Sequence, residues 1–344
     1  MPSVLFVWRR TPPPLLIGGA EVSQQLLAEE FAAAGWQVTY LGSHEAPWNR
    51  ETQLPALRRH LAVHDVPYEA RQHEIRYTWN GVHCRAVTQD RLRSALTTAL
   101  TEPSPDLMLT SQEGAADLTA QARHHTIVAA WLHSVSPTSQ KVLHGRPHAA
   151  MAVSRFVLSR ARALSGTCLV LIYPPFAPPP VTAPSGTGVL MVNPVPAKGA
   201  ALLHQVIKLL PRQKFTLVEG WWDTAAEFAA YPNVTYLSRV YDMSAVYADH
   251  RLLLVPSVVE DAFPRVIIEA ALHQIPSLGT DRGGIPEAIG EGGTTFPVHS
   301  DAATWAAAIE APHSPLLGRR GREHAAAFTR PLLPELAASG IIPP

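Results

Sequence analysis

Short apolar runs alternate with amphipathic stretches along most of the chain. The runs at residues 4–8, 37–41 and 107–110 have the length and composition of buried parallel strands. Between the first two, apolar residues recur at helical spacing from about Ala20 until Gly35 ends the predicted helix. The buried stripe of this helix is expected to consist of Val22, Leu26, Leu27 and Phe31. Because strand and helix alternate in this way up to residue 172, the pattern predicts a parallel sheet covered by helices on both faces.

Two local signals interrupt the alternation. Asn80-Gly81 lies between apolar runs at 75–79 and 82–87, which is the strongest short-range signal for a β-hairpin. Residues 173–184 include six prolines, which cannot pair inside a sheet and are typical of a semi-rigid linker. A second alternating half follows this linker. The chain of 344 residues is therefore predicted to form two α/β domains.

The second half contains the stretch with the clearest chemistry, residues 251–293. A short strand at 252–255 precedes a predicted helix in which apolar residues recur at helical spacing. The residues of this stripe are Phe263, Val266, Ile267, Ala270 and Ala271. A second strand at 275–278 then meets Gly283-Gly284, a turn that opens another helix. This order again indicates a parallel sheet.

Asp261, Arg265 and Glu269 stand four residues apart and are predicted to share one side of that helix. Two carboxylates eight residues apart on a helix would be separated by about 12 Å, at about 1.5 Å per residue. A glycosidase needs its two carboxyl groups about 5–9.5 Å apart. The pair is therefore better suited to gripping two ends of a long polyhydroxylated ligand. The alternative is that Arg265 and Glu269 form only an exposed ion pair, in the weaker of the two orientations.

Composition excludes several classes of function. The 28 basic and 28 acidic residues balance, so the chain has no nucleic-acid footprint and would associate at most weakly with an anionic membrane surface. The two cysteines, Cys84 and Cys168, offer neither a disulfide framework nor a metal-binding spacing. No apolar run approaches the ~20 residues that cross a bilayer, and the N-terminus lacks the charge order of a secretory signal. We therefore expect a cytoplasmic protein.

Two motifs carry a resemblance to a known family. PS-x-x-E-D-A-F-P-R-V-x-x-E-A, followed by GT-D-x-GG-x-PE, resembles the donor-binding segment of glycosyltransferase family 4 (glycosyl transferases group 1), retaining enzymes of the GT-B type. GGAE-x5-LA-x-x-F-x-x-x-G-x-x-VTYL is similar to the opening of the same family. The dinucleotide-binding fingerprint G-x-G-x-x-G is absent. The resemblance extends over nearly all of residues 4–328.

This resemblance implies an α/β fold of the GT-B class, in which two Rossmann-like domains face each other across a cleft. Residues 1–173 would form an acceptor-binding domain, and residues 186–314 a donor domain that binds the nucleotide sugar. Residues 174–185 would be the linker between them. The C-terminal helix at 315–330 would pack back on the first domain, and the proline-punctuated tail at 331–344 is expected to be poorly ordered.

The family's motifs imply donor-binding residues in the second domain. Glu269 would hold the ribose hydroxyls of the nucleotide, and Asp261 would contact the donor sugar. Lys198 matches a lysine that clamps the donor diphosphate, whereas Asn193 stands where the family commonly has an arginine. The further donor contacts that the resemblance implies are Phe263, Arg265, Gly283 and Gly284.

His133 is the candidate from the first domain. It directly follows the predicted strand at 127–132, at the carboxyl edge where open α/β sheets bind ligands. Family members often carry a histidine at the matching place, near the donor sugar. The resemblance therefore implies a catalytic set that consists of His133, Asp261 and Lys198.

Gly18, Gly19 and Glu21 form the expected acceptor or phosphate loop at the start of the first helix. Glycine lets a ligand approach the backbone closely there, and the free N–H groups of a helix N-terminus attract anions. The sequence contains no D-x-D motif, so neither a metal ion nor another cofactor is expected. Charge on the departing diphosphate would be met by cationic side chains and by backbone amides near Gly284.

The predicted reaction is transfer of a sugar from a nucleoside diphosphate sugar to an acceptor hydroxyl or amine, with retention and without a metal ion. A nucleotide-sugar 2-epimerase has the same architecture and would give an isomer of the donor without any acceptor. A non-catalytic nucleotide-sugar-binding protein is favoured only by departures from the family pattern at Asn193, Asp261 and Pro264. Pro264 replaces a common glycine and removes one backbone N–H.

Overall fold

The chain folds into two compact units. Unit 1 contains residues 1–175 and 331–344, and unit 2 contains residues 176–330. No described helix is both long and apolar enough to cross a membrane. Part of the predicted linker lies outside the described residues, which exclude 180–185. The computed structural model describes residues 1–15, 18–101, 103–162, 166–179, 186–220, 225–240, 242–312 and 314–343.

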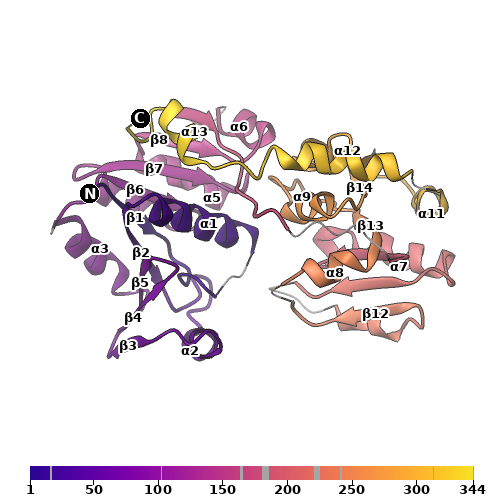
Figure 1. Cartoon of the computed structure of the whole chain (residues 1–344), viewed down its shortest axis with the longest axis horizontal. Coiled ribbons are helices and arrows are strands. Elements are labelled where there is room, and N and C mark those ends of the chain that lie inside the picture. Colours follow the sequence, from indigo (N-terminus) through magenta and orange to yellow (C-terminus); the bar gives the residue numbers. More distant parts are fainter. Residues whose placement is uncertain are drawn as a thin grey trace. The chain divides into compact units, whose positions relative to one another are not determined.

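Unit 1 forms a nine-stranded sheet in its described residues (Figure 1). Strands β5, β2, β1, β6, β7, β8 and β9 follow one another in parallel. The predicted hairpin joins β4 to β5 in antiparallel, and its turn residues Asn80 and Gly81 have φ of 47° and 80°. Strand β3, which was not predicted, pairs antiparallel with β4 at the edge of the sheet. The strands are β1 (Ser3–Val7), β2 (Gln37–Ser43), β3 (Tyr68–Arg71), β4 (Glu74–Trp79), β5 (Val82–Val87), β6 (Leu107–Ser111), β7 (Ile127–Leu132), β8 (Ala149–Ala152) and β9 (Cys168–Leu171).

Helix α1 (Gly19–Ala33) begins at the predicted glycine pair but buries a different face from the one expected. Leu27 and Phe31 are buried as predicted, whereas Val22 and Leu26 are half-exposed. The polar residues buried in its first two turns are Glu21, Ser23 and Gln24. These turns lie at the polar carboxyl edge of β1, where Glu21 contacts Arg10. The other helices of unit 1 are α2 (Leu54–Val63), α3 (Leu92–Thr101), α4 (Ala115–Ala122), α5 (Pro137–Gln140), α6 (Arg155–Arg162) and α13 (Leu333–Ala338).

Unit 2 forms, in its described residues, a six-stranded parallel sheet in the order β12, β11, β10, β13, β14, β15. Its core includes buried Phe215, Phe228 and Trp305. The elements are β10 (Gly188–Val192), α7 (Ala200–Leu209), β11 (Phe215–Val218), β12 (Val234–Leu237), α8 (Ser244–Ala248), β13 (His250–Val255), α9 (Arg265–Leu272), β14 (Ser277–Thr280), α10 (Ile285–Ile289), β15 (Gly293–Phe296), α11 (Ala302–Glu310) and α12 (Pro315–Ala326). Two Rossmann-like α/β units confirm the predicted fold class.

Helix α9 begins later than predicted. Because it starts at Arg265, Asp261 and Phe263 lie in the preceding loop rather than on the helix. Pro264 explains the difference: it lies extended at the N-cap, with φ −71° and ψ 109°, and its ring disfavours a helical residue before it. The helical separation predicted between Asp261 and Glu269 is therefore wrong.

By its internal contacts, helix α12 belongs to unit 2. Its predicted packing on the first domain stays a prediction. It packs on α9 through a face of small residues, Gly318, Gly321 and Ala325. A Cβ atom on Gly318 would lie 2.2 Å from the carbonyl oxygen of Gln274, so only glycine permits this close approach. The small-residue face therefore allows α12 to pack closely on other elements of unit 2.

The C-terminal tail is folded rather than poorly ordered. Helix α13 belongs to unit 1, and the N–H of Leu333 donates to Glu30 Oε1 on α1 at 2.8 Å. In Figure 1 it lies, in yellow, among the elements of unit 1. Proline spacing suggested disorder, but the tail carries enough apolar surface to anchor itself. Its buried apolar residues are Leu332, Leu336, Ile341 and Ile342.

Candidate functional site

Polar and charged side chains gather where the parallel strands of each unit end, the edge at which open α/β sheets bind ligands. In unit 2, Asn193 directly follows β10, and Ser257 and Asp261 lie in the loop after β13. In unit 1, Arg10 lies in the segment after β1, and His133 directly follows β7.

Lys198 and Asp261, 63 residues apart in sequence, form an ion pair. Lys198 ends a short 3₁₀ turn (Pro196–Lys198), so it lies before α7 rather than within it. Gly199 follows with φ 94°, and a Cβ atom there would lie 2.2 Å from the carbonyl oxygen of Pro256. This glycine lets the lysine turn approach the end of β13. The Lys198 and Asp261 side chains are 28% and 16% exposed, which leaves the cation within reach of an anion.

The loop that carries Asp261 is held from two sides. The hydroxyl of Ser257 donates to Asp261 Oδ2 at 2.6 Å. The N–H of Gly284 donates to the Asp261 carbonyl oxygen at 2.6 Å. Gly283 has φ 58°, and a Cβ atom on it would lie 2.3 Å from the same oxygen. The amide of Gly284, expected to face a diphosphate, is instead used to fix the Asp261 loop.

Glu269 lies on α9 with a donor at each carboxylate oxygen. Arg265 Nε donates to Oε1 at 3.2 Å, and the Tyr247 hydroxyl donates to Oε2 at 3.0 Å. The Arg265 side chain is only 9% exposed, so the pair is not the exposed one predicted as the alternative. Burial, and after it the charge of Glu269, raises the pKa of Tyr247 well above its ordinary value. The hydroxyl therefore stays protonated and able to donate.

Phe263 and Arg265, two predicted donor contacts, have their side chains inside unit 2. The Phe263 ring lies 5.2 Å from the Phe328 ring and 6.5 Å from the Phe176 ring. The guanidinium carbon of Arg265 lies 4.0 Å from the centroid of Phe176, a cation–π contact. Burial lowers the pKa of Arg265 despite the opposing effect of Glu269, but from a value so high that the group stays charged. Both side chains thus take part in contacts inside unit 2, and their contact with the donor stays a prediction.

Asn193 has φ 60°, and its N–H donates to the carbonyl oxygen of Val218 at 2.8 Å. Its side chain lies against Gly220, where a Cβ atom would come within 2.0 Å of Oδ1. Asn193 thus lies directly after β10, five residues before Lys198 in the sequence. Its contact with the donor stays a prediction.

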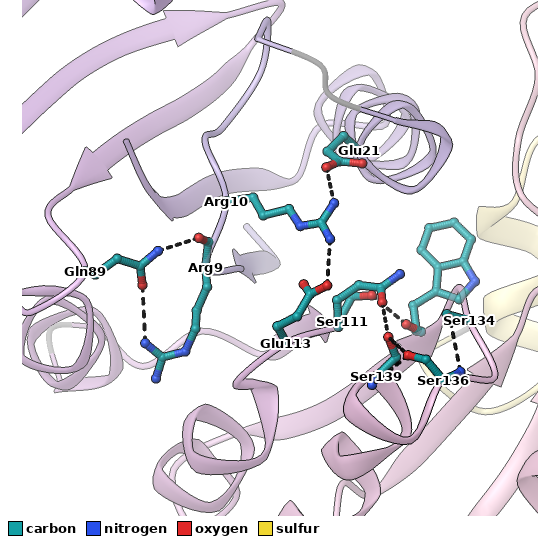
Figure 2. Close-up of polar contacts among 11 residues, drawn as sticks. Arg9, Arg10, Glu21, Gln89, Ser111, Glu113, Ser134, Ser136 and Ser139 are labelled. Atoms are coloured by element: carbon teal, nitrogen blue, oxygen red, sulfur yellow. Dashed lines mark hydrogen bonds and ion pairs between the residues drawn. The ribbon is translucent and has the colours of Figure 1, made fainter. Parts of the chain in front are cut away.

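In unit 1, Arg10 joins Glu21 of α1 to Glu113, which follows β6 (Figure 2). Arg10 Nη1 donates to Glu21 Oε1, and Nη2 donates to Glu113 Oε1 at 2.7 Å. Burial lowers the pKa of Arg10, but the two carboxylates more than offset it, so the pKa is raised above its ordinary value. The second oxygen of each carboxylate is buried and has no hydrogen-bond partner among the described residues.

The predicted acceptor or phosphate loop already contains an anion of the chain itself. Gly18 is the N-cap of α1, and Glu21 is the acidic residue of its first turn. A Cβ atom on Gly18 would lie 3.3 Å from Glu21 Oε2. Since Glu21 already balances the positive end of the helix dipole, and Glu113 lies close by, this edge favours a neutral or cationic group over a phosphate.

His133 is half-buried at the end of β7, with its ring 4.6 Å from that of Trp131. A serine-rich segment follows it. Ser136 caps α5 by accepting a hydrogen bond from the N–H of Ser139, and the Ser139 hydroxyl donates to Gln112 (Figure 2). The chain after β7 is thus ordered by polar contacts. Among the described residues, no group of three or more His, Cys, Asp or Glu is placed to hold a metal ion.

The structure brings together Lys198 with Asp261, and Arg265 with Glu269. The sequence did not identify four residues that contact the predicted site residues or their partners. Arg10 and Glu113 each follow a buried strand closely, which is a usable signal for residues at the carboxyl edge. The contact of Tyr247 with Glu269 has no local signal, because 22 residues separate them. The missed partners are Arg10, Glu113, Tyr247 and Ser257.

Comparison with known protein families finds a match over part of the chain. Residues 187–312 match the family described as glycosyl transferases group 1. This region lies within unit 2 and includes Lys198, Asp261 and Glu269. No curated protein sequence matches the chain.

Many solved structures have the same fold over nearly the whole chain. Sucrose-phosphate synthase from Thermosynechococcus elongatus is 17% identical, with a TM-score of 0.72 over 99% of this chain and 97% of that one. Anabaena HepE, in complex with UDP-glucose, is 17% identical, with a TM-score of 0.73 over 98% and 99%. The catalytic domain of Arabidopsis thaliana starch synthase IV, bound to ADP and acarbose, is 12% identical, with a TM-score of 0.69 over 98% of each chain. At these identities the likeness establishes the fold, which is GT-B. With the family match, it supports a glycosyltransferase.

Proposed function

We propose that this protein transfers a sugar from a nucleoside diphosphate sugar to an acceptor. The observation that carries the proposal is the placement of Lys198, Asp261 and Glu269 within the region that matches glycosyl transferases group 1. A nucleotide sugar has three distinct parts: ribose hydroxyls, a diphosphate and sugar hydroxyls. The three side chains offer a carboxylate for the ribose, a cation for the diphosphate and a carboxylate for the sugar.

Lys198 has the central electrostatic role in this proposal. As the bond between sugar and diphosphate breaks, negative charge grows on the leaving group, and a nearby cation lowers the barrier. Because Lys198 is paired with Asp261, the diphosphate must compete with that carboxylate for the cation. Asp261, still held by Ser257 and Gly284, is then available to accept hydrogen bonds from the sugar hydroxyls.

We assign the acceptor to unit 1. Glu113, whose side chain is 32% exposed beside Arg10, suits an acceptor that donates hydrogen bonds through hydroxyl or amine groups. His133, by its resemblance to the family's histidine, would contact the donor sugar at the reacting centre. The expected setting is the cytoplasm, with at most weak attraction to an anionic membrane surface.

The reaction is further proposed to retain anomeric configuration and to need no metal ion or other cofactor. Retention rests on the resemblance to family 4. Metal independence rests on the absence of D-x-D from the sequence and on the cation that Lys198 supplies. Turnover should survive EDTA. If EDTA abolishes turnover and Mg²⁺ or Mn²⁺ restores it, the role assigned to Lys198 is wrong.

A thermal-shift screen with UDP-, ADP- and GDP-sugars tests the proposal. A ligand at one hundred times its Kd stabilises the folded chain by about 2.7 kcal/mol. We expect one nucleotide class to raise Tm, and Lys198→Ala to reduce that shift. No shift with any nucleotide sugar would overturn the proposal. Conversion of the donor to an isomer without acceptor would indicate the 2-epimerase, and binding with no turnover in a broad acceptor panel would indicate a non-catalytic binder.

A further inference from the structure

The carboxylate of Glu269 accepts a hydrogen bond at each of its two oxygens from another side chain of unit 2. Two different residues each fix one of its oxygens: Arg265 Nε at 3.2 Å from Oε1, and the Tyr247 hydroxyl at 3.0 Å from Oε2. The side chain is still 30% exposed, so part of the carboxylate faces solvent. Each carboxylate oxygen accepts more than one hydrogen bond, and acceptor capacity therefore remains on both.

Arg265 cannot turn away from this contact. Its guanidinium lies against the ring of Phe176, at 4.0 Å from the centroid, with only 9% of the side chain exposed. Phe176 is itself held by Phe328, through ring contact and through a backbone hydrogen bond from its N–H to the Phe328 carbonyl oxygen at 3.2 Å. A buried guanidinium is costly without a paired anion. Glu269 supplies that anion.

Tyr247 is equally constrained. It lies on α8 with 2% exposure, and its ring stacks on that of His273 at 5.4 Å and 29°. Since its hydroxyl is buried, it needs a hydrogen-bond partner, and Glu269 Oε2 is that partner. The elements α8 and α9 therefore hold the carboxylate from two directions.

We propose that Arg265 and Tyr247 are positioning residues that fix the Glu269 carboxylate to receive the two adjacent hydroxyls of a ribose. Arg265 does this in place of the diphosphate contact that its motif position implied. A carboxylate held at both oxygens presents its remaining lone pairs in one plane, and a vicinal diol can meet both at once. This inference rests on the proposed function, since it requires a nucleotide in unit 2.

Nucleotides that differ by one ribose hydroxyl provide the probe. UDP, ADP and GDP are titrated by calorimetry, and the tightest binder is compared with its 2′-deoxy form. A residue that merely stabilises the fold changes both affinities equally. A residue that positions Glu269 changes the ratio between them, because the deoxy form has lost one of the two hydroxyls.

The variants are Tyr247→Phe, Arg265→Lys and Glu269→Gln, with Tyr231→Phe as a matched control. Tyr231 is a tyrosine of the same unit whose hydroxyl contacts His204 Nδ1 at 3.0 Å rather than Glu269. We expect the wild-type chain to prefer the ribose form about tenfold. Tyr247→Phe should reduce this preference to about twofold, chiefly by weakening the ribose form. Arg265→Lys should give an intermediate ratio, and the control should keep the wild-type ratio.

The outcomes distinguish failure of the proposed function from failure of the positioning role alone. If none of the three nucleotides binds the wild-type chain, the proposed function and the inference both fall. If Glu269→Gln removes the ribose preference while Tyr247→Phe and Arg265→Lys keep it, the inference is overturned and the function stands. If the wild-type chain binds a nucleotide without ribose preference, Glu269 is not the ribose ligand, and the inference falls alone. Should Arg265→Lys fail to fold, Tyr247→Phe decides the matter.

Discussion

Asp261→Asn should strengthen binding of a free nucleoside diphosphate while it weakens turnover. The substitution keeps the size of the side chain and its ability to accept a hydrogen bond from Ser257, but it removes the charge that holds Lys198. In the wild-type chain, a diphosphate must displace Asp261 from Lys198. In the variant, Lys198 has no such competitor.

The magnitude follows from the exposure of the ion pair. Exposed pairs contribute about 0–1 kcal/mol, and breaking a buried pair costs about 3–5 kcal/mol. The Lys198 and Asp261 side chains are 28% and 16% exposed, which is between these two cases, so we assign the pair a contribution of about 1–2 kcal/mol. Removal of about 1 kcal/mol of competition would tighten nucleoside diphosphate binding about fivefold. Loss of the sugar contact should lower kcat by about a hundredfold, equivalent to about 2.7 kcal/mol.

Calorimetry with the free nucleoside diphosphate and initial rates with the nucleotide sugar separate the two effects. Asp301→Asn is the control, because Asp301 is an exposed aspartate of the same unit, outside the donor-binding motif, whose carboxylate accepts from the N–H of Thr304. It should leave both quantities unchanged. If Asp261→Asn weakens nucleoside diphosphate binding as much as Lys198→Ala does, the two residues do not compete in the way proposed.

Three further predictions concern single residues. His133→Ala should lower kcat more than donor affinity, whereas His148→Ala, which removes a hydrogen bond to the N–H of Val128, should leave kcat unchanged; equal kinetics in both variants would make His133 structural. Glu269→Ala should weaken nucleoside diphosphate binding at least ~10-fold and also lower the free energy of unfolding by about 3 kcal/mol, because it leaves buried Arg265 without its anion. Urea denaturation in parallel with the titration tests this, and unchanged stability would contradict the buried pair. Burial lowers the pKa of His273, so the unfolded chain takes up a proton there first, and stability should fall as pH drops below about 6.5. In His273→Gln, the free energy of unfolding obtained from urea denaturation should change less between pH 7 and pH 5 than in the wild-type chain.

The sequence was informative wherever one local signal determined the structure. Alternating strands and helices predicted both parallel sheets, and Asn80-Gly81 predicted the hairpin at the edge of unit 1. The glycine pair before α1 located the start of that helix to within a residue. The predicted strand at 127–132 likewise located His133 at the carboxyl edge of its sheet.

Contacts between distant segments were beyond such signals. Pro264 moved the start of α9, so Asp261 lies in the loop before the helix. There it contacts Lys198 and Gly284, two residues that the helical pattern did not place near it. Arg265 seemed exposed by its spacing, but Phe176, from the segment after β9, covers it. The first turns of α1 bury polar residues because they face charged groups at the edge of the sheet, where hydrophobic periodicity does not apply. Tertiary environment, rather than local pattern, decided each of these cases.

The central claim is that Lys198 assists departure of a nucleoside diphosphate as sugar passes to an acceptor. The direct measurement follows nucleoside diphosphate release and glycosylated product by mass spectrometry, using the nucleotide sugar found in the binding screen and a panel of hydroxyl and amine acceptors. The account predicts equal amounts of nucleoside diphosphate and glycosylated product with the wild-type chain. It also predicts a fall of about a hundredfold or more with Lys198→Ala. Product formation at the wild-type rate in Lys198→Ala, or a donor left intact with every acceptor, would contradict it.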